Sequence, residues 1–168
     1  MSRWRPPTSK SSPYITPRGR LKLENELKGL WDRRTKVTAA LSAAAAEGDR
    51  SENAEYIYRK KELREIDKRI GYLQKRIPEL KVVTEISDST RIFFGAWVSL
   101  ENQFAEEMTY RIVGPDEFDD AAEYISVDSP LAKALLNKTV DDEIKLVTAT
   151  GEMTYIVIDI DYSKSVPD

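Results

Sequence analysis

The chain contains no cysteine and no histidine among its 168 residues. Without cysteine it has no disulfides, no thiolate zinc site and no cysteine nucleophile. Without histidine it lacks the commonest general base and the commonest zinc ligand. Any catalytic chemistry must therefore use carboxylates, hydroxyls, lysine or arginine, and any bound metal should be a hard cation held by oxygen, such as Mg²⁺.

Long hydrophobic runs are also missing, since no apolar stretch approaches the roughly 20 residues that cross a bilayer. The basic N-terminus, with Arg3, Arg5 and Lys10, is followed by proline and serine instead of the apolar segment of a signal peptide. We therefore expect a monomeric cytoplasmic protein with no membrane partner. Residues 1–13 are expected to form a disordered tail.

The net charge of −3 conceals a strong asymmetry along the chain. Residues 1–81 contain 20 Lys and Arg against 11 Asp and Glu, whereas residues 82–168 contain 6 against 18. The first half therefore carries +9 and the second −12. Opposite charges suggest two surfaces with different partners, and nucleic acid is the obvious candidate for the basic half.

The basic half predicts two long helices. Thr16 followed by Pro17 is a good N-cap with proline at the first helical position. Two heptad seams with alternating spacings of four and three follow, separated only by a short turn after Glu47. The helices must fold back into an antiparallel coiled-coil hairpin over residues 14–81, about 45 Å long. The seam positions are Leu23, Leu27, Leu30, Arg34, Val37, Leu41 and Ala44, then Tyr56, Arg59, Leu63, Ile66, Ile70, Leu73, Ile77 and Leu80.

Residues 82–168 predict a compact α+β domain. Strand-forming residues between turn residues indicate strands at 92–100, 108–113, 123–127, 143–148 and 153–160. Asp128, Ser129 and Pro130 open a short helix over 131–136. Four apolar side chains of this domain are expected in its core: Phe93, Trp97, Tyr110 and Ile125.

Two carboxylates, Asp49 and Glu52, lie three residues apart in the turn of the hairpin. Their spacing alone favours a capping box, with Asp49 as N-cap and Glu52 at the third position of a helix that begins near Arg50. The same place would also suit a metal, because Mg²⁺ takes one or two protein carboxylates and keeps several waters. Two exposed acids cannot hold Mg²⁺ well alone, but they could complete a site on another protein.

The segment from Gly48 to Tyr56 (GDRSENAEY) resembles the tip motif of the Gre family of transcript-cleavage factors. The resemblance extends from residue 14 to about residue 162. It includes Tyr-Ile-Thr-Pro at 14–17, Leu-Trp at 30–31, RKKELREID at 59–67, Phe-Gly-Ala-Trp at 94–97 and Ser-Val-Asp-Ser-Pro at 126–130. Trp31, the basic run after the tip and the segment 94–97 are similar to the GreB branch, not the GreA branch.

The resemblance implies a coiled-coil hairpin followed by an FKBP-like domain. It implies that the hairpin enters the secondary channel of bacterial RNA polymerase. There the acids that correspond to Asp49 and Glu52 share a second Mg²⁺ with the polymerase and stimulate cleavage of backtracked RNA. The chain itself would bind no cofactor alone and would act as an accessory factor, with the 3′ end of the RNA and the DNA of the elongation complex as further contacts.

Other candidate residues have a functional role and a simpler structural role open to them. Ser51, Asn53, Glu55 and Tyr56 could orient the acids, the attacking water or the RNA end, or they could be ordinary residues of a helix start. Asp128, Ser129 and Pro130 could dock on a coiled coil at the channel rim, as the resemblance implies, or only cap a helix. A basic patch centred about 20 Å from the tip could bind RNA phosphates or be a solvated face. Its residues are Arg33, Arg34, Lys36, Arg59, Lys60, Lys61, Arg64 and Lys68.

Three other functions compete with transcript cleavage. A channel-binding regulator of initiation that does not cleave RNA is the main alternative, although the zinc finger of DksA-like regulators cannot form without cysteine. A prolyl isomerase with a dimerising coiled coil is the second. A free-standing nuclease is disfavoured, because the tip cannot assemble a metal site alone.

Overall fold

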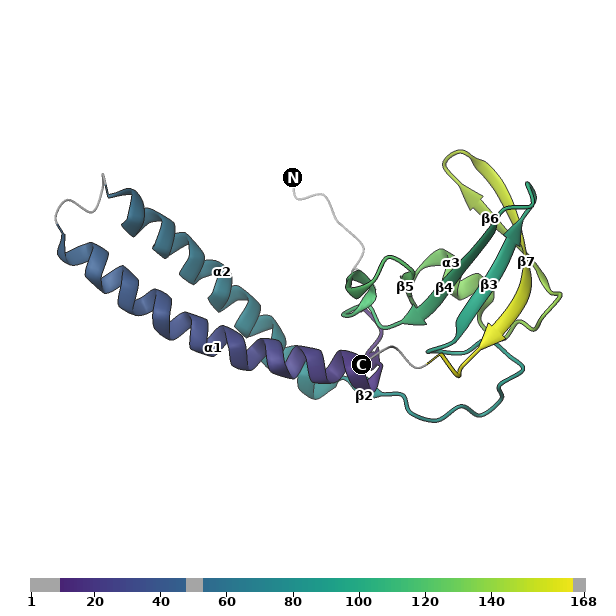
Figure 1. The fold of residues 1–168 in the computed structure, drawn as a ribbon, viewed down its shortest axis with the longest axis horizontal. Coiled ribbons are helices and arrows are strands. Elements are labelled where there is room, and N and C mark those ends of the chain that lie inside the picture. Colours follow the sequence, from purple (N-terminus) through teal and green to yellow (C-terminus); the bar gives the residue numbers. More distant parts are fainter. Residues whose placement is uncertain (1–9, 48–52, 165–168) are drawn as a thin grey trace, which may run out of the picture. The chain divides into compact units, whose positions relative to one another are not determined.

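A computed structural model describes residues 10–47 and 53–164 of the chain (Figure 1). Its contacts divide the chain into two compact units, one formed by Arg18–Leu80 and the other by Met1–Pro17 together with Lys81–Asp168. The first unit is a pair of long helices, and the second contains a five-stranded sheet with a short helix. The predicted fold class, a helical hairpin followed by an α+β domain, is confirmed.

The hairpin consists of α1 (Pro17–Ala46) and α2 (Ala54–Arg76), and a 3-10 turn, η1 (Ile77–Glu79), continues α2. Helix α1 begins at Pro17, as the Thr-Pro pair predicts. Val37 is fully buried between the helices with Ile66 and Ile70, and three further seam residues pack against them: Leu27, Leu30 and Leu63. The heptad spacing therefore identified the packed face of each helix.

Ion pairs between the two helices show that they run in opposite directions. Arg34 Nε lies 2.7 Å from Asp67 Oδ1, and Arg69 Nε lies 2.6 Å from Glu26 Oε1. An early residue of α1 thus meets a late residue of α2, while a later residue of α1 meets an earlier one of α2. The hairpin is therefore antiparallel.

The sheet of the second unit has the strand order β5-β4-β3-β7-β6. Its strands are β3 (Trp97–Asn102), β4 (Glu107–Val113), β5 (Tyr124–Ser126), β6 (Glu143–Thr148) and β7 (Gly151–Asp161). Strands β4 and β5 are parallel, and the other neighbours are antiparallel. A short 3-10 turn, η2 (Phe118–Asp120), lies between β4 and β5 in sequence.

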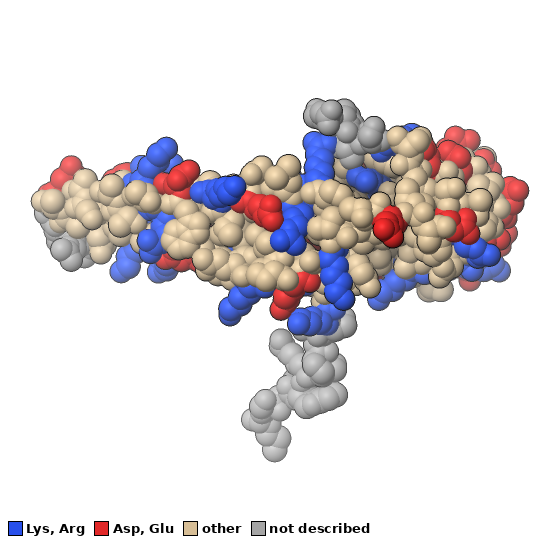
Figure 2. Space-filling view, turned by 90° about the horizontal axis from the view of Figure 1, so that it is seen from below, with Lys and Arg blue, Asp and Glu red and all other residues tan. Residues whose placement is uncertain are grey.

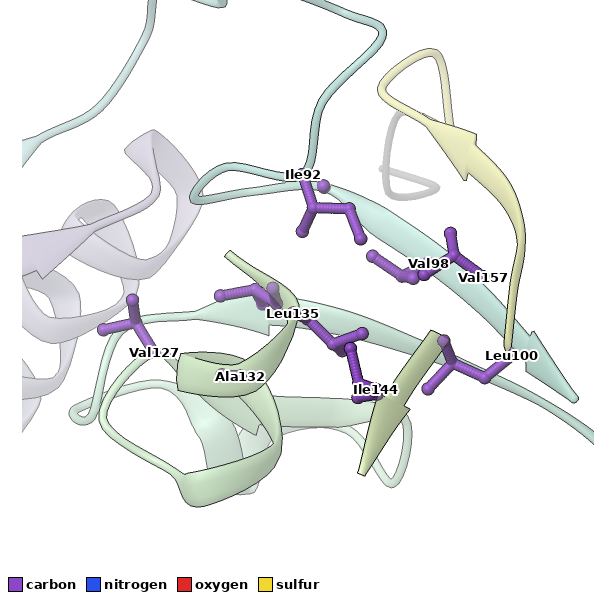
Figure 3. Packing of buried hydrophobic residues seen from close by; sticks show 10 residues of the cluster. Ile92, Val98, Leu100, Val127, Ala132, Leu135, Ile144 and Val157 are labelled. Atoms are coloured by element: carbon purple, nitrogen blue, oxygen red, sulfur yellow. The ribbon is translucent and has the colours of Figure 1, made fainter. Parts of the chain in front are cut away.

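Helix α3 (Pro130–Leu135) covers one face of this sheet. Figure 3 shows Ala132 and Leu135 of α3 turned toward the side chains of the strands. Val98, Leu100 and Val157 are fully buried there, with Ile144 nearly so. The alternation of buried and half-buried residues along β3 is the pattern of a strand with one covered face.

The first predicted strand begins later than expected. Residues 92–96 are not part of β3, because Gly95 adopts a φ of 88° and the strand starts only at Trp97. The Trp97 ring is not in the core as predicted but stacks beside two cations, Arg111 at 5.9 Å and Lys164 at 5.6 Å. Phe93 is half-buried outside the main core cluster, whereas Tyr110 and Ile125 pack against that cluster as predicted.

The N-terminal segment contributes a strand that the sequence did not predict. Strand β1 (Tyr14–Ile15) pairs in parallel with β2 (Lys81–Val82). The carbonyl of Pro13 accepts a hydrogen bond of 2.8 Å from the Lys81 N–H. Residues 10–13 therefore differ from the predicted disordered tail, whereas residues 1–9 of that tail lie outside the described residues.

Candidate functional site

The predicted catalytic and metal-binding acids, Asp49 and Glu52, lie outside the described residues, as does Ser51. The structure describes what holds the two ends of their segment. Asn53 Nδ2 donates a hydrogen bond of 2.9 Å to the Ala44 carbonyl in the last turn of α1. Asn53 Oδ1 accepts a hydrogen bond of 3.1 Å from the Tyr56 N–H in the first turn of α2. One side chain thus joins the end of one helix to the beginning of the next.

Asn53 is the N-cap of α2, with an extended backbone at φ −81° and ψ 101°. The alternative in which Asp49 caps this helix and Glu52 occupies its third position is therefore wrong. Asparagine caps a helix as well as aspartate does, and here it also donates across the turn. Asp49 and Glu52 both precede the cap in sequence, so capping of α2 does not account for them.

Glu55 and Tyr56, predicted as supporting residues, lie in the first turn of α2 and interact along the helix. Glu55 Oε1 lies 2.8 Å from Arg59 Nε. The Lys60 ammonium lies 5.9 Å from the centre of the Tyr56 ring. Both contacts are ordinary helix-surface interactions, and the supporting roles of these residues stay predictions.

Three arginines of the predicted basic patch are paired with carboxylates. Arg59 Nη1 lies 3.0 Å from Glu62, and Arg33 on α1 forms an ion pair with the same carboxylate. Hydrogen bonds from both arginines, of which that from Arg33 has the larger effect, hold the pKa of the Glu62 carboxyl below its usual range. Arg34 pairs instead with Asp67. These exposed pairs neutralise part of the charge that the sequence places on the hairpin.

The remaining five cations of the predicted patch are exposed, and none forms an ion pair with a carboxylate of residues 10–47 or 53–164. They are Lys36, Lys60, Lys61, Arg64 and Lys68. Lys61, Arg64 and Lys68 are spaced by three and four residues and form one row on α2. Each of the three precedes by two positions a residue that packs against α1. Two positions correspond to a rotation of roughly 200° around the helix, so the row lies on the face of α2 that points away from α1.

Figure 2 shows basic side chains along the hairpin, interleaved with acidic ones, and acidic side chains gathered over the α+β domain. Arg33 and Arg34 are consecutive, roughly 100° apart around α1, and they pair with different residues of α2. The eight predicted cations are therefore not one continuous group of free charges. Among the described residues, the part of the predicted patch without an ion pair to a carboxylate is this row of three on α2 together with Lys36 and Lys60.

The predicted docking corner lies between β5 and α3. Ser129 is the N-cap of α3, and its Oγ accepts a hydrogen bond of 3.2 Å from the Ala132 N–H. Pro130 is exposed at the first helical position, so the helix-cap alternative holds for these two residues. Asp128 accepts hydrogen bonds from Ser12, with its Oδ2 lying 2.8 Å from the Ser12 nitrogen. The docking role of the corner is not decided by these contacts.

The sequence interpretation missed the partners of two polar residues. Ser12 contacts Asp128, and Thr16 donates a backbone hydrogen bond of 2.9 Å to the buried Glu117 carboxylate. More than 100 residues separate each pair, so no local spacing could have predicted them. Residue type gave no signal either, because Glu117 stands in an acidic segment beside Asp116, Asp119 and Asp120.

No group of three or more acidic residues that could hold a metal ion is found within the part of the chain that the structure describes. In the same residues, no helix is both long and apolar enough to cross a membrane.

Comparisons with known proteins cover both units. The family model described as transcription elongation factor, N-terminal, matches residues 13–82, and that described as transcription elongation factor, GreA/GreB, C-term, matches residues 87–162. A protein of Xanthomonas axonopodis pv. citri named transcription elongation factor GreB is 55% identical over 166 residues, which are 97% of this chain and 99% of that protein. The Pseudomonas aeruginosa protein of the same name is 54% identical, over 96% of this chain and 98% of its own length.

Among solved structures, the crystal structure of GreA factor homolog 1 from Thermus thermophilus is 26% identical. The match covers 88% of this chain and 97% of that chain, with a TM-score of 0.41. A score below 0.5 does not establish a shared arrangement, so the fold rests on the elements of this chain.

Proposed function

Since this chain belongs to the GreA/GreB family of transcription elongation factors and is 55% identical to a member named GreB, we propose that it stimulates RNA cleavage by bacterial RNA polymerase. The observation that carries the proposal is the tip segment at 48–56, with its acidic pair, between two long antiparallel helices. The hairpin enters the secondary channel of the polymerase and brings this segment to the active site.

In this proposal Asp49 and Glu52 are the two ligands that the factor adds to the polymerase. Two carboxylates are a suitable but incomplete ligand set for Mg²⁺, which keeps several of its waters or takes further ligands from a partner. When bound, a second Mg²⁺ supplies stabilisation of the attacking and leaving oxygens in phosphoryl chemistry. The factor is thus an accessory protein that completes a site whose remaining ligands belong to the polymerase.

The described residues near the tip would hold and position its ends. The two hydrogen bonds of Asn53 fix the end of α1 against the beginning of α2. Ser51, Glu55 and Tyr56 would orient the acids, water or the RNA end. The exposed row of Lys61, Arg64 and Lys68 would contact phosphates of the backtracked RNA, and Lys36 and Lys60 would add to its field.

The corner at Asp128, Ser129 and Pro130 would dock on the rim of the polymerase channel. Asp128 is the charged member of this corner, and Pro130 offers an exposed apolar ring beside it. We place the factor in the cytoplasm with its polymerase, acting as a monomer, with DNA of the elongation complex as a further contact.

The test is a cleavage assay on a stalled, backtracked elongation complex in Mg²⁺. Wild type should release short 3′ fragments of RNA, and the double variant Asp49→Ala with Glu52→Ala should slow their release by about 100-fold. Glu47→Ala is the matched control, because Glu47 is an exposed carboxylate just outside the acidic pair. It should cleave as wild type does.

Failure of wild type to accelerate cleavage would refute the proposal. If wild type binds the polymerase and alters initiation without cleaving RNA, the alternative of a non-cleaving channel regulator would replace it. Equal cleavage by wild type and the double variant would remove Asp49 and Glu52 from the mechanism.

A further inference from the structure

The carboxylate of Asp128 is already occupied by a ligand from its own chain. The Ser12 N–H donates to Oδ2 at 2.8 Å, and the Ser12 hydroxyl donates to Oδ1. Both residues are half-buried, and 116 positions separate them in sequence. Ser12 fills one acceptor site on each carboxylate oxygen, so a partner whose donors approach Asp128 from that side competes with Ser12.

Ser12 is held near Asp128 by the residues that follow it. The Pro13 carbonyl accepts from the Lys81 N–H at 2.8 Å, and the Ile15 carbonyl accepts from the Val83 N–H at 3.0 Å. The Tyr14 ring lies 6.1 Å from that of Phe94. These contacts fix the chain immediately after Ser12, so the serine can leave Asp128 and return without a long search.

The contacts of Ser12 can also break without disrupting the strand. Lys10 to Pro13 have no regular secondary structure, and β1 starts only at Tyr14. Pro13 has no N–H, so no backbone ladder extends from β1 back to Ser12. The residues Lys10–Ser12 are therefore not part of the pairing between β1 and β2, and a departure of Ser12 from Asp128 would leave that pairing intact.

We propose that the segment at Lys10–Ser12 is an intramolecular cover that competes with RNA polymerase for Asp128. This inference rests on the proposed docking role of the corner. In the free protein Ser12 satisfies the carboxylate. On the polymerase a pair of N–H or O–H donors from the rim takes the place of Ser12, and the segment moves away.

A cover of this kind lowers the apparent affinity by the fraction of molecules in which the corner is open. Ser12→Ala removes the hydroxyl donor and leaves the backbone N–H. A hydrogen bond to a charged group is strong enough to shift the open fraction by about tenfold. The apparent Kd for polymerase should therefore fall by about that factor, since a variant with fewer contacts in the free protein binds its partner more tightly.

The experiment measures the Kd of the full-length protein for RNA polymerase in four variants: Ser12→Ala, Ser11→Ala, Asp128→Ala and the double variant Ser12→Ala with Asp128→Ala. Ser11 is an exposed serine next to Ser12 and serves as the matched control. Ser12→Ala should tighten binding, Ser11→Ala should not change it, and Asp128→Ala should weaken it. In the Asp128→Ala background, Ser12→Ala should have no further effect. Melting temperatures of all four report whether the fold is intact.

Hydrogen exchange gives a second readout on the wild-type protein. The Ser12 amide should exchange faster when polymerase is bound, because its acceptor has been taken. Unchanged or weaker binding by Ser12→Ala overturns the inference, as does tightening that persists without Asp128. If Asp128→Ala binds as tightly as wild type, the docking role itself fails, and the cleavage assay still tests the acidic tip separately.

Discussion

Gly114 lies where the backbone of β1 passes closest to the loop after β4. A Cβ atom at this position would lie 2.0 Å from the Tyr14 carbonyl oxygen and 3.3 Å from Glu117 Oε1. Glu117 is 2% exposed, and its carboxylate accepts hydrogen bonds from the Gly114 N–H and from the Thr16 N–H, each at 2.9 Å. A single residue without a side chain thus lets β1 and the buried carboxylate meet.

We expect Gly114→Ala to destabilise the domain by about 1–3 kcal/mol, the usual cost of adding a methyl group to a packed site. Backbone atoms, which cannot rotate away as a side chain can, form the nearest contact. Thermal unfolding followed by circular dichroism would show the loss. An unchanged melting temperature would mean that β1 does not approach Gly114 this closely.

Gly29→Ala is the control, with an expected effect of opposite sign. Gly29 lies inside α1 with no atom within 4 Å of a built Cβ. Alanine has a higher helix propensity than glycine by about 1 kcal/mol, so this variant should be slightly more stable than wild type.

The side chain of Asn53 connects helix α1 to helix α2 at the tip of the hairpin. Asn53→Ala would remove both the cap of α2 and the hydrogen bond to Ala44. The first turn of α2 should lose about 1–2 kcal/mol of stability. Amide exchange at Tyr56 and Ile57, measured by NMR, should accelerate. Cleavage should fall, because the segment that carries the acids is less well held, while affinity for polymerase changes little.

Asn53→Asp separates the two functions of this side chain. Aspartate keeps the acceptor that caps α2 but lacks the donor that reaches Ala44. Its amide exchange should resemble that of wild type, whereas its cleavage should be intermediate. If the alanine variant cleaves RNA as fast as wild type, the link between the helices has no part in positioning the tip.

The helices and most strands could be predicted because their patterns are local. The heptad seam identifies Val37, Ile66 and Ile70 as buried, and β6 has the predicted bounds. Strand β1 could not be predicted, because two residues carry no period and their pairing with β2 depends on residues 67 positions away. Trp97 was placed in the core by its type alone, whereas its ring faces Arg111.

Some residues of the candidate site could likewise be predicted from local sequence, and others could not. The acids at the tip and the row on α2 follow from spacing and residue type. The cap at Asn53 was assigned to Asp49 instead, since the two residues are equally good caps and only the helix start distinguishes them. The contact of Ser12 with Asp128 depends on how the whole chain folds, so the sequence alone carries no sign of it.

The number of basic residues on the hairpin is larger than the positive charge that a nucleic acid would meet there. The carboxylates of Glu62, Asp67 and Glu55 neutralise three arginines of the predicted patch. The row on α2 retains its charge and faces away from the seam. Acidic residues gathered on the other unit disfavour contact of that unit with phosphates (Figure 2).

Reversing the charge of the row, with Lys61→Glu, Arg64→Glu and Lys68→Glu, should therefore weaken engagement of long backtracked RNA. Each contact with a single-stranded phosphate contributes about 0.7 to the slope of log K against log salt, so three lost contacts should reduce that slope by about 2. The slope can be measured from cleavage at subsaturating factor over a range of salt concentrations.

Reversal of Lys28, Lys75 and Lys145, three exposed lysines outside the row, changes the net charge equally and is the matched control. Equal effects of the two triple variants would show that the row acts only through net charge, whereas a reduced slope in the first alone would identify it as the phosphate contact.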